Sequence, residues 1–347
     1  MRALLIANPY ATSTTAVRRE VITRALASEL DLNVVQTRYR GHARHVAEGA
    51  ARDGYELVLT LGGDGTVNEV VNGMLWACPP AAAGQPTAEG PAAAQPAAGG
   101  AAAGGPSAAQ PTATESGATP PGAPIFAPLP GGSANVFTRA LGLPADLVDA
   151  TGQVLGALQE RRTKNIGVGL ADQRYFCANA GLGLDAEVVR VVDGQRARGR
   201  GASSAMYIMA AVRQFCAVTN RRVPALCLER DGAPALNGLF LGIVSNSSPW
   251  TYLGQRPVLA SPRAGFDTGL DLLAVRTLGT LRTLNLVRQM LDGGSGPSGR
   301  HVVSLHDQPV LTFRATRPVA FQVDGEYVGE REHVELRSIP NALRVLV

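Results

Sequence analysis

The alternation of apolar and polar residues over the first 78 positions predicts three strands, each followed by a helix. The strands are expected at residues 3–7, 32–37 and 57–61. The last run has no polar alternation, which is typical of a strand buried on both faces of a parallel sheet. A helix from about residue 15 to 30 is expected to bury Val17, Val21, Ala25 and Leu26, and a second helix begins near Ala43. This order predicts a doubly wound, Rossmann-like α/β domain.

A glycine turn, Gly-Gly-Asp-Gly at residues 62–65, follows the third strand and precedes a helix. Thr66 and Glu69 have the spacing of an N-terminal capping box. Ligands bind outside the carboxyl ends of strands in open α/β sheets, and glycines let a phosphate approach the backbone. The alternative is a tight turn in which Asp64 is only a turn residue.

Asp64 favours the functional interpretation, because an acidic side chain in a phosphate turn implies a cation or a proton transfer. The turn has neither the Gly-x-x-x-x-Gly-Lys-Ser/Thr nor the Gly-x-Gly-x-x-Gly spacing. A P-loop ATPase and an ordinary dinucleotide fold are therefore disfavoured.

Residues 79–123 are almost entirely Ala, Gly, Pro, Ser, Thr and Gln, a composition that predicts a disordered surface insertion. A fourth strand at residues 125–130 then leads into a second glycine turn, Gly131 to Asn135. A short helix is expected from Arg139 to about Gly142. We place the first domain at residues 1–143.

Residues 144–338 are expected to form an antiparallel, β-sandwich-like domain, because short strand-like segments alternate with Gly, Asn, Asp and Pro. One helix is expected within it, at about residues 203–217. Residues 339–347 are expected to return to the first domain.

Composition excludes several classes of protein. The net charge of +4 comes without a basic stripe bearing aromatic residues, so nucleic acid binding is not expected. Four scattered cysteines without a Cys-x-x-Cys pair are typical of a reduced cytoplasmic protein. No apolar run approaches the ~20 residues that cross a bilayer, so membrane contact would be peripheral, at the inner face. The basic segment 196–200 before an apolar helix is a candidate for that contact, or a solvated loop.

Four short motifs together carry a family resemblance. They are Gly-Gly-Asp-Gly-Thr-Val-Asn-Glu-Val at 62–70, Asn8-Pro9, Gly-Gly-Ser-Ala-Asn-Val-Phe at 131–137, and Asp324-Gly325-Glu326. They resemble the diacylglycerol kinase catalytic domain, in the bacterial soluble lipid kinase branch that shares its fold with NAD kinases. The resemblance implies two domains with the active site in the cleft between them.

The resemblance also implies roles for individual residues. Glu326 would accept the proton of the attacking hydroxyl, and Asp64 would act in catalysis with the Mg²⁺ of ATP. Tyr10, Ala11 and Val136 depart from the family pattern. The residues implied to bind ATP are Asn8, Thr37, Gly62, Gly63, Asp64, Gly65, Thr66, Asn68, Gly132, Ser133 and Asn135.

A structural magnesium site is implied in the stretch 261–271, with Gly265, Asp267, Thr268 and Leu270 as candidate ligands. Without gaps, the usual aspartate falls on Thr268. The expected function is transfer of the γ-phosphoryl group of ATP to a lipid hydroxyl, chiefly of diacylglycerol. The alternatives are a sphingoid-base or other lipid kinase, an NAD kinase-like enzyme, and a nucleotide-binding regulator without turnover. The lipid substrate and a membrane surface are the expected partners, and a homodimer stays open.

Overall fold

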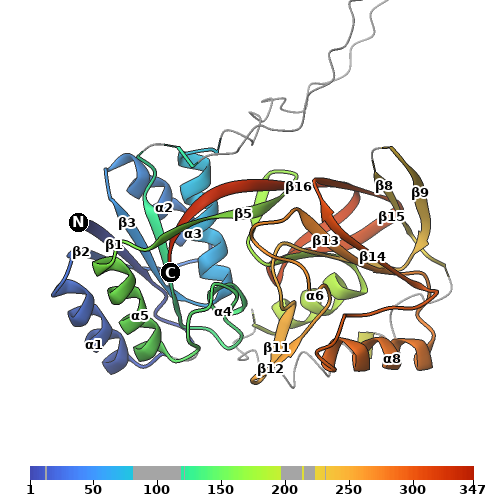
Figure 1. Ribbon diagram of the computed structural model, residues 1–347, viewed down its shortest axis with the longest axis horizontal. Coiled ribbons are helices and arrows are strands. Elements are labelled where there is room, and N and C mark those ends of the chain that lie inside the picture. The colour runs from blue at the N-terminus through green and yellow to red at the C-terminus, as the bar shows by residue number, and fades with distance from the viewer. Residues whose placement is uncertain (12–13, 81–118, 121, 197–212, 215–222, 231) are drawn as a thin grey trace, which may run out of the picture.

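The computed structural model describes all residues except 12–13, 81–118, 121, 197–212, 215–222 and 231. The chain forms an N-terminal α/β part and a C-terminal β-rich part, joined by two paired strands (Figure 1). The predicted insertion 79–123, the basic segment 196–200 and the predicted helix 203–217 fall largely or wholly outside the described residues.

A four-stranded parallel sheet, ordered β2–β1–β3–β4, forms the centre of the N-terminal part. This confirms the predicted doubly wound domain. Its elements are β1 (Arg2–Ala7), α1 (Ala16–Ala27), β2 (Asp31–Gln36), α2 (His42–Arg52), β3 (Leu57–Gly62), α3 (Asp64–Ala77), β4 (Ile125–Pro130), α4 (Val136–Ala140) and α5 (Leu147–Gln159).

Successive side chains of each strand point to opposite faces, so the sheet is covered on both sides. Helices α1 and α5 cover one face, where Leu5 and Leu59 pack with Leu26 and Val154. Helices α2 and α3 cover the other, where Ile6 and Val58 pack in the same cluster as residues of α3. Helix α5 lies beyond residue 143, where we predicted the first domain to end, yet it packs on this sheet.

Three local predictions in this part are wrong. Helix α1 buries Ile22 and Leu26, whereas Val17 and Val21 are 71% and 57% exposed. An i, i+4 pair fits either face of a helix, so its spacing alone did not identify the buried side. Helix α4 begins at Val136, so Arg139 lies in its last turn.

The predicted capping box is also not formed, because α3 begins at Asp64, two residues before Thr66. The Glu69 carboxylate instead accepts hydrogen bonds from the amides of Gly41 (2.7 Å) and Ala43 (3.1 Å) at the start of α2. Glu69 therefore fastens α2 to α3.

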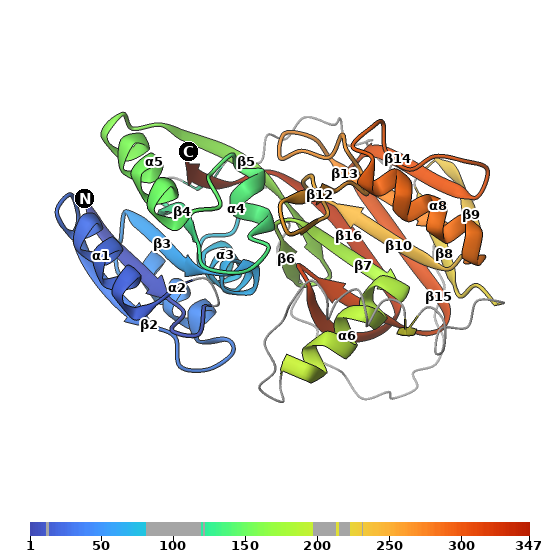
Figure 2. The ribbon, with the colours of Figure 1, turned by 90° about the horizontal axis from the view of Figure 1, so that it is seen from below.

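The C-terminal part is antiparallel, as predicted. Its elements are β5 (Thr163–Ala171), β6 (Arg174–Phe176), β7 (Asn179–Gly183), α6 (Leu184–Arg196), β8 (Leu226–Arg230), β9 (Ala233–Leu239), β10 (Leu241–Ser245), β11 (Thr251–Leu253), β12 (Arg256–Val258), β13 (Leu270–Val275), α8 (Thr280–Leu291), β14 (Val302–Gln308), β15 (Val310–Val323) and β16 (Glu326–Leu346). Figure 2 shows α6 and α8 beside these strands.

Strand β16 connects the two parts. It pairs with β15 over its first half, then with β5, and finally lies parallel to β4, where Val345 is opposite Phe126. The parallel and antiparallel strands therefore belong to one hydrogen-bonded network. This arrangement fixes the start of β16 relative to the carboxyl ends of β3 and β4.

Candidate active site at the paired glycine turns

The two glycine turns lie side by side because β3 and β4 are neighbours in the sheet. The amide of Gly131 donates to the Gly62 carbonyl at 2.8 Å. A Cβ on Gly132 would lie 2.7 Å from the Gly63 Cα, and one on Gly131 would lie 2.9 Å from the Gly62 Cα. Glycine at these positions is thus required by the close approach of the two backbones.

Two polar side chains hold the second turn in place. Asn135, at φ 48°, accepts from the Gly132 amide and donates to the Gly132 carbonyl, both at 2.8 Å. The Asp64 carboxylate accepts from the Phe137 amide at 3.1 Å. Burial raises the pKa of Asp64, and the amides of Phe137 and Val136 oppose that rise. Asp64 therefore joins the first turn to the second.

The first turn of α3 presents backbone donors. The bond from the Val67 amide to the Gly63 carbonyl, 3.1 Å long, is the one that opens the helix. The amides of Asp64, Gly65 and Thr66 precede it and are among the groups that a helix leaves without an internal partner. Such a terminus, carrying the positive end of the helix dipole, suits a phosphate.

Three other predicted nucleotide contacts, Asn8, Ser133 and Thr37, differ in where they lie relative to this helix terminus. The Asn8 Nδ2 lies 3.3 Å from the Thr66 hydroxyl, so strand β1 and helix α3 meet there. Ser133 is exposed at the tip of the second turn. Thr37 follows β2, and its amide donates to the Ala7 carbonyl at 2.9 Å.

Glu326 reaches the first glycine turn from the C-terminal part. Asp324 (φ 48°) and Gly325 (φ 76°) form a two-residue hairpin between β15 and β16, as their sequence predicts. The hairpin places Glu326 so close to Gly65 that a Cβ there would lie 3.0 Å from the Glu326 Oε1.

Two arginines flank the Glu326 carboxylate. Arg174 Nη2 lies 2.6 Å and Arg40 Nη2 3.1 Å from its Oε2. The charge of Glu326 is the main reason why the pKa of Arg40 is raised. Arg40 is 64% exposed, whereas Glu326 is 17% exposed. No sequence motif indicated either arginine, because Arg40, Arg174 and Glu326 come from distant segments of the chain that meet only in the folded protein.

Asn68 and Asp324 lock the two parts of the protein together. Asn68 Nδ2 donates to Asp324 Oδ2 (2.8 Å) and to the Tyr175 carbonyl (2.9 Å). Arg174 donates to the Asn68 Oδ1. Asn68 is 1% exposed. The structure therefore places Asn68 within the interface between the two parts, away from the open turn where the resemblance placed a nucleotide contact.

Asp324 accepts three backbone hydrogen bonds besides that of Asn68. The donors are the amides of Cys177 (2.8 Å), Ala178 (2.8 Å) and Asn179 (3.0 Å). Burial raises the pKa of Asp324, and these bonds oppose the rise. Its carboxylate has the function of holding the hairpin that carries Glu326.

A buried acid that sequence reasoning missed lies behind this hairpin. Asp185, in the first turn of α6, accepts from Gln322 Nε2 at 2.8 Å. Burial raises its pKa to about 6, although the Gln322 bond acts in the opposite direction. The preceding run Gly-Leu-Gly-Leu at residues 181–184 was the signal available in the sequence.

The loop implied to hold a structural magnesium is closed by its own side chains. The Thr268 hydroxyl lies 3.0 Å from the Gly265 carbonyl, itself a candidate ligand. Asp267 pairs with Lys164 at 2.6 Å. Leu270 begins β13 and is buried.

The nearby acids are also engaged. Asp271 accepts from the Asp307 amide (3.0 Å) and lies 2.7 Å from the His306 Nδ1, while Asp307 accepts from Gly269. Within the described residues no group of three or more His, Cys, Asp or Glu could hold a metal ion. These residues do not fit a magnesium ion in this loop.

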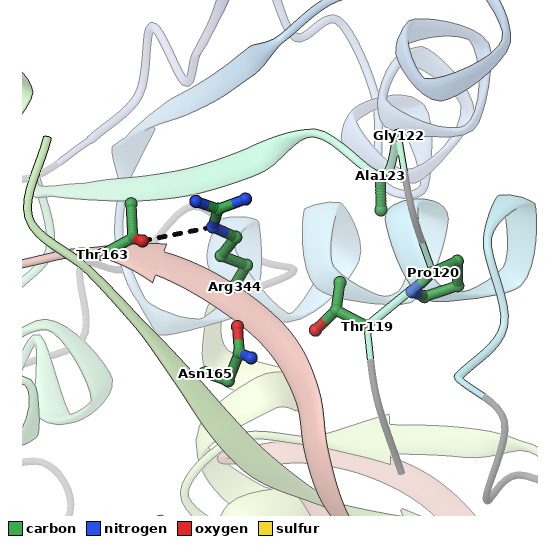
Figure 3. A pocket seen from close by; sticks show the side chains of 7 residues that line it. All are labelled: Thr119, Pro120, Gly122, Ala123, Thr163, Asn165 and Arg344. Atoms are coloured by element: carbon green, nitrogen blue, oxygen red, sulfur yellow. Dashed lines mark hydrogen bonds between the residues drawn. The ribbon is translucent and has the colours of Figure 1, made fainter.

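A cavity of about 300 Å³ lies elsewhere (Figure 3), and it is lined by Thr119, Pro120, Gly122, Ala123, Thr163, Asn165 and Arg344. The Arg344 Nε donates to the Thr163 hydroxyl at 3.2 Å. Residues 119–123 lead into the amino end of β4, and a six-residue strand spans about 20 Å, so this cavity is remote from the glycine turns.

The fold and the site define a class of protein: a parallel α/β sheet with paired glycine turns, onto which an antiparallel region delivers an acidic hairpin. Residues 2–169 of this chain match the model of the diacylglycerol kinase catalytic domain family. The resemblance identified from the motifs is thereby confirmed.

Individual relatives agree with this assignment. A diacylglycerol kinase of Bacillus subtilis (strain 168) is 23% identical over 94% of this chain and 90% of its own length. Sphingosine kinase 2 of Homo sapiens is 31% identical over 77 residues, which are 21% of this chain and 12% of that protein.

Solved structures share the fold. A crystal structure of a diacylglycerol kinase from Bacillus anthracis str. Sterne superposes with a TM-score of 0.62 at 17% identity, over 99% of this chain and 96% of that one. A second structure from the same organism gives a TM-score of 0.69 at 19% identity, over 99% and 94%.

Proposed function

We propose that the protein transfers the γ-phosphoryl group of ATP to the hydroxyl of a lipid, with diacylglycerol as acceptor and phosphatidate as product. The observation that carries this proposal is the position of Glu326. Its carboxylate lies against Gly65, in the first turn of the helix whose amide groups suit a phosphate.

The residues divide the reaction between the two parts of the chain. The amides at the start of α3 and the second glycine turn would hold the phosphates of ATP. The acceptor hydroxyl would attack the γ-phosphorus, the bond from that phosphorus to the β–γ bridging oxygen would break, and ADP would leave. Glu326 would take the hydroxyl proton, and Arg40 and Arg174 would stabilise the charge around it.

A magnesium ion that arrives with ATP would be held at the first glycine turn. Mg²⁺ in such sites uses one or two carboxylates, substrate phosphates and water, so a single acid is enough. Asp64 is the acid of the first glycine turn and would hold the ion. When bound, Mg²⁺ neutralises charge on the phosphates.

The experiment is transfer of label from [γ-³²P]ATP, with Mg²⁺, to separate dispersions of diacylglycerol, monoacylglycerol, sphingosine and ceramide, and to NAD. We expect labelled phosphatidate. Label confined to sphingosine or to NAD would assign one of the alternative kinases. ATP binding without label in any acceptor would favour a regulator without turnover.

A further inference from the structure

Helix α8 (Thr280–Leu291) is apolar on two faces, although it needs only one to pack on the protein. Its inner face buries Leu286 and Met290 in one apolar cluster with Ile243 of β10, Val258 of β12 and Leu273 of β13. These contacts account for the docking of the helix. They leave the second apolar face unexplained.

The second face points outward. Leu281 is 83%, Leu284 61% and Val287 46% exposed. At 3.6 residues per turn these three fall in an arc of about 120°. Scattered exposed hydrophobic residues are normal on a protein surface, but both leucines that are exposed among the described residues lie on this helix.

Positive charge surrounds this apolar face. The helix contains no acidic residue, and Arg256, Arg282, Arg288 and Arg300 are exposed on it or beside it. Asp292 is the acid at its end, and it pairs with Arg288 at 2.6 Å. Burial, followed by the charges of Arg282 and Arg300, lowers the pKa of the neighbouring His301, so these cations lie close together.

Contacts through one hairpin link α8 to α4, the helix that follows the second glycine turn. Figure 1 has α1, α5 and α8 along its lower edge, and Figure 2 views the same helices from below. The hairpin β11–β12 links α8 to α4. Arg256 donates to the Leu291 carbonyl (2.8 Å), and the Arg139 guanidinium lies 3.3 Å from the centre of the Tyr252 ring.

We propose that the outward face of α8 is the surface by which this protein binds an anionic lipid bilayer. The inference rests on the proposed function, because a lipid kinase must reach an acceptor that resides in a membrane. The leucines would enter the boundary between headgroups and acyl chains, while the arginines would stay at the level of the anionic headgroups. A second copy of the chain is a poorer occupant, because two-fold pairing would bring like charges together.

The test is sedimentation with vesicles of phosphatidylcholine alone, or of phosphatidylcholine and phosphatidylglycerol at 60:40, without ATP or diacylglycerol. We expect binding to the anionic vesicles. The variant Leu281→Glu/Leu284→Glu should bind at least about tenfold more weakly, because it removes two inserted side chains. Arg282→Glu/Arg300→Glu should lose the preference for phosphatidylglycerol, by about fivefold for each arginine.

Val34→Glu is the matched control, since Val34 is an exposed aliphatic residue on β2 and should not matter for binding. Thermal melts monitor folding, and the single variant Leu281→Glu replaces the double one if the latter does not fold. Unchanged binding by the leucine variants would overturn the proposal. The proposal would also be overturned if the wild type self-associated instead of binding vesicles and the leucine variants lost that self-association in sedimentation velocity.

Failure of the proposed function gives a different result. In that case no lipid would be phosphorylated, while vesicle binding would still depend on α8. If both proposals hold, the leucine variant should keep wild-type turnover of a short-chain diacylglycerol dispersed in detergent and lose turnover of diacylglycerol embedded in vesicles.

Discussion

Asp64 illustrates how one residue serves both structure and the proposed chemistry. Its carboxylate bonds to the Phe137 amide, and it is also the acid proposed to hold Mg²⁺. The variant Asp64→Asn keeps an oxygen that can accept from that amide but removes the charge. We therefore expect a melting temperature no lower than wild type, because burial disfavours the charged form, and a loss of turnover of at least about a hundredfold.

Lipid phosphorylation at saturating Mg²⁺ and ATP, beside thermal melts, measures both effects. Asp149→Asn, an exposed aspartate on α5, is the control and should keep its activity. Near wild-type turnover by Asp64→Asn would mean that Asp64 only joins the two turns.

Asp185 should make stability depend on pH. Its folded-state pKa is about 6, against an ordinary value of 3.8, so the folded state binds more protons than the unfolded state between these values. The contribution of Asp185 to stability therefore falls as pH rises from about 4 to 6, and stays low above that window.

Asp185→Asn cannot ionise and should escape this loss. The difference in free energy of unfolding between the variant and wild type should increase from about pH 4 to 6. At neutral pH the variant should be more stable by at most about 3 kcal/mol. Urea unfolding from pH 4.5 to 8 measures it. A difference between variant and wild type that does not change with pH would show that Asp185 does not titrate in this range.

At the scale of the elements, the hairpin joining β15 and β16 depends on Asp324. The variant Asp324→Gly keeps a residue that tolerates φ 48° but leaves the amides of Cys177, Ala178 and Asn179 without their acceptor. We expect a loss of about 2–5 kcal/mol in the free energy of unfolding. Gly325→Asn, which tolerates positive φ, should cost under about 1 kcal/mol. If the two variants lost equal free energy of unfolding, turn geometry alone, and not the Asp324 carboxylate, would stabilise the hairpin.

The strands and glycine turns of the N-terminal part could be predicted because their signals are local. Apolar runs end in glycine, and Asp-Gly between two strands is a strong short-range signal for a two-residue hairpin. The capping box failed for a tertiary reason, since α2 takes the carboxylate of Glu69. Helix α8 was missed because its apolar residues lie on two faces and blur the helical period.

The candidate site was predicted only in part. The motifs identified both turns and Glu326, but Arg40 and Arg174 meet Glu326 through folding of the whole chain. Asn68 lies in the motif and yet serves the interface, because β6 and the hairpin pack against its side of α3. Sequence spacing cannot show which neighbours a helix will meet.

At the scale of the whole molecule, β16 makes the two parts continuous, since it pairs with β15, β5 and β4 in turn.

Within the described residues no helix is long and apolar enough to cross a bilayer.

The composition of residues 81–118 predicts that they are dispensable for folding. Replacing them with a short Gly/Ser link should change the free energy of unfolding by at most ~1–2 kcal/mol, because the cost of closing a loop grows only logarithmically with its length. Residues 119–123 are kept, since Thr119 donates to the Asn341 carbonyl at 2.9 Å. A cooperative loss of the folded state in a thermal melt would show that the segment packs.

The central claim is that Glu326 accepts the proton of a lipid hydroxyl at the first glycine turn. Glu326→Gln keeps the shape of the side chain but cannot take a proton, and a positioned base contributes ~10²–10⁴-fold. The decisive measurement is single-turnover phosphorylation of dispersed diacylglycerol, beside equilibrium ATP binding, for wild type and variant. We predict a rate lowered by about 10²-fold or more with ATP affinity within a few-fold of wild type. A rate within a few-fold of wild type, or an equal loss of ATP binding, would contradict the claim.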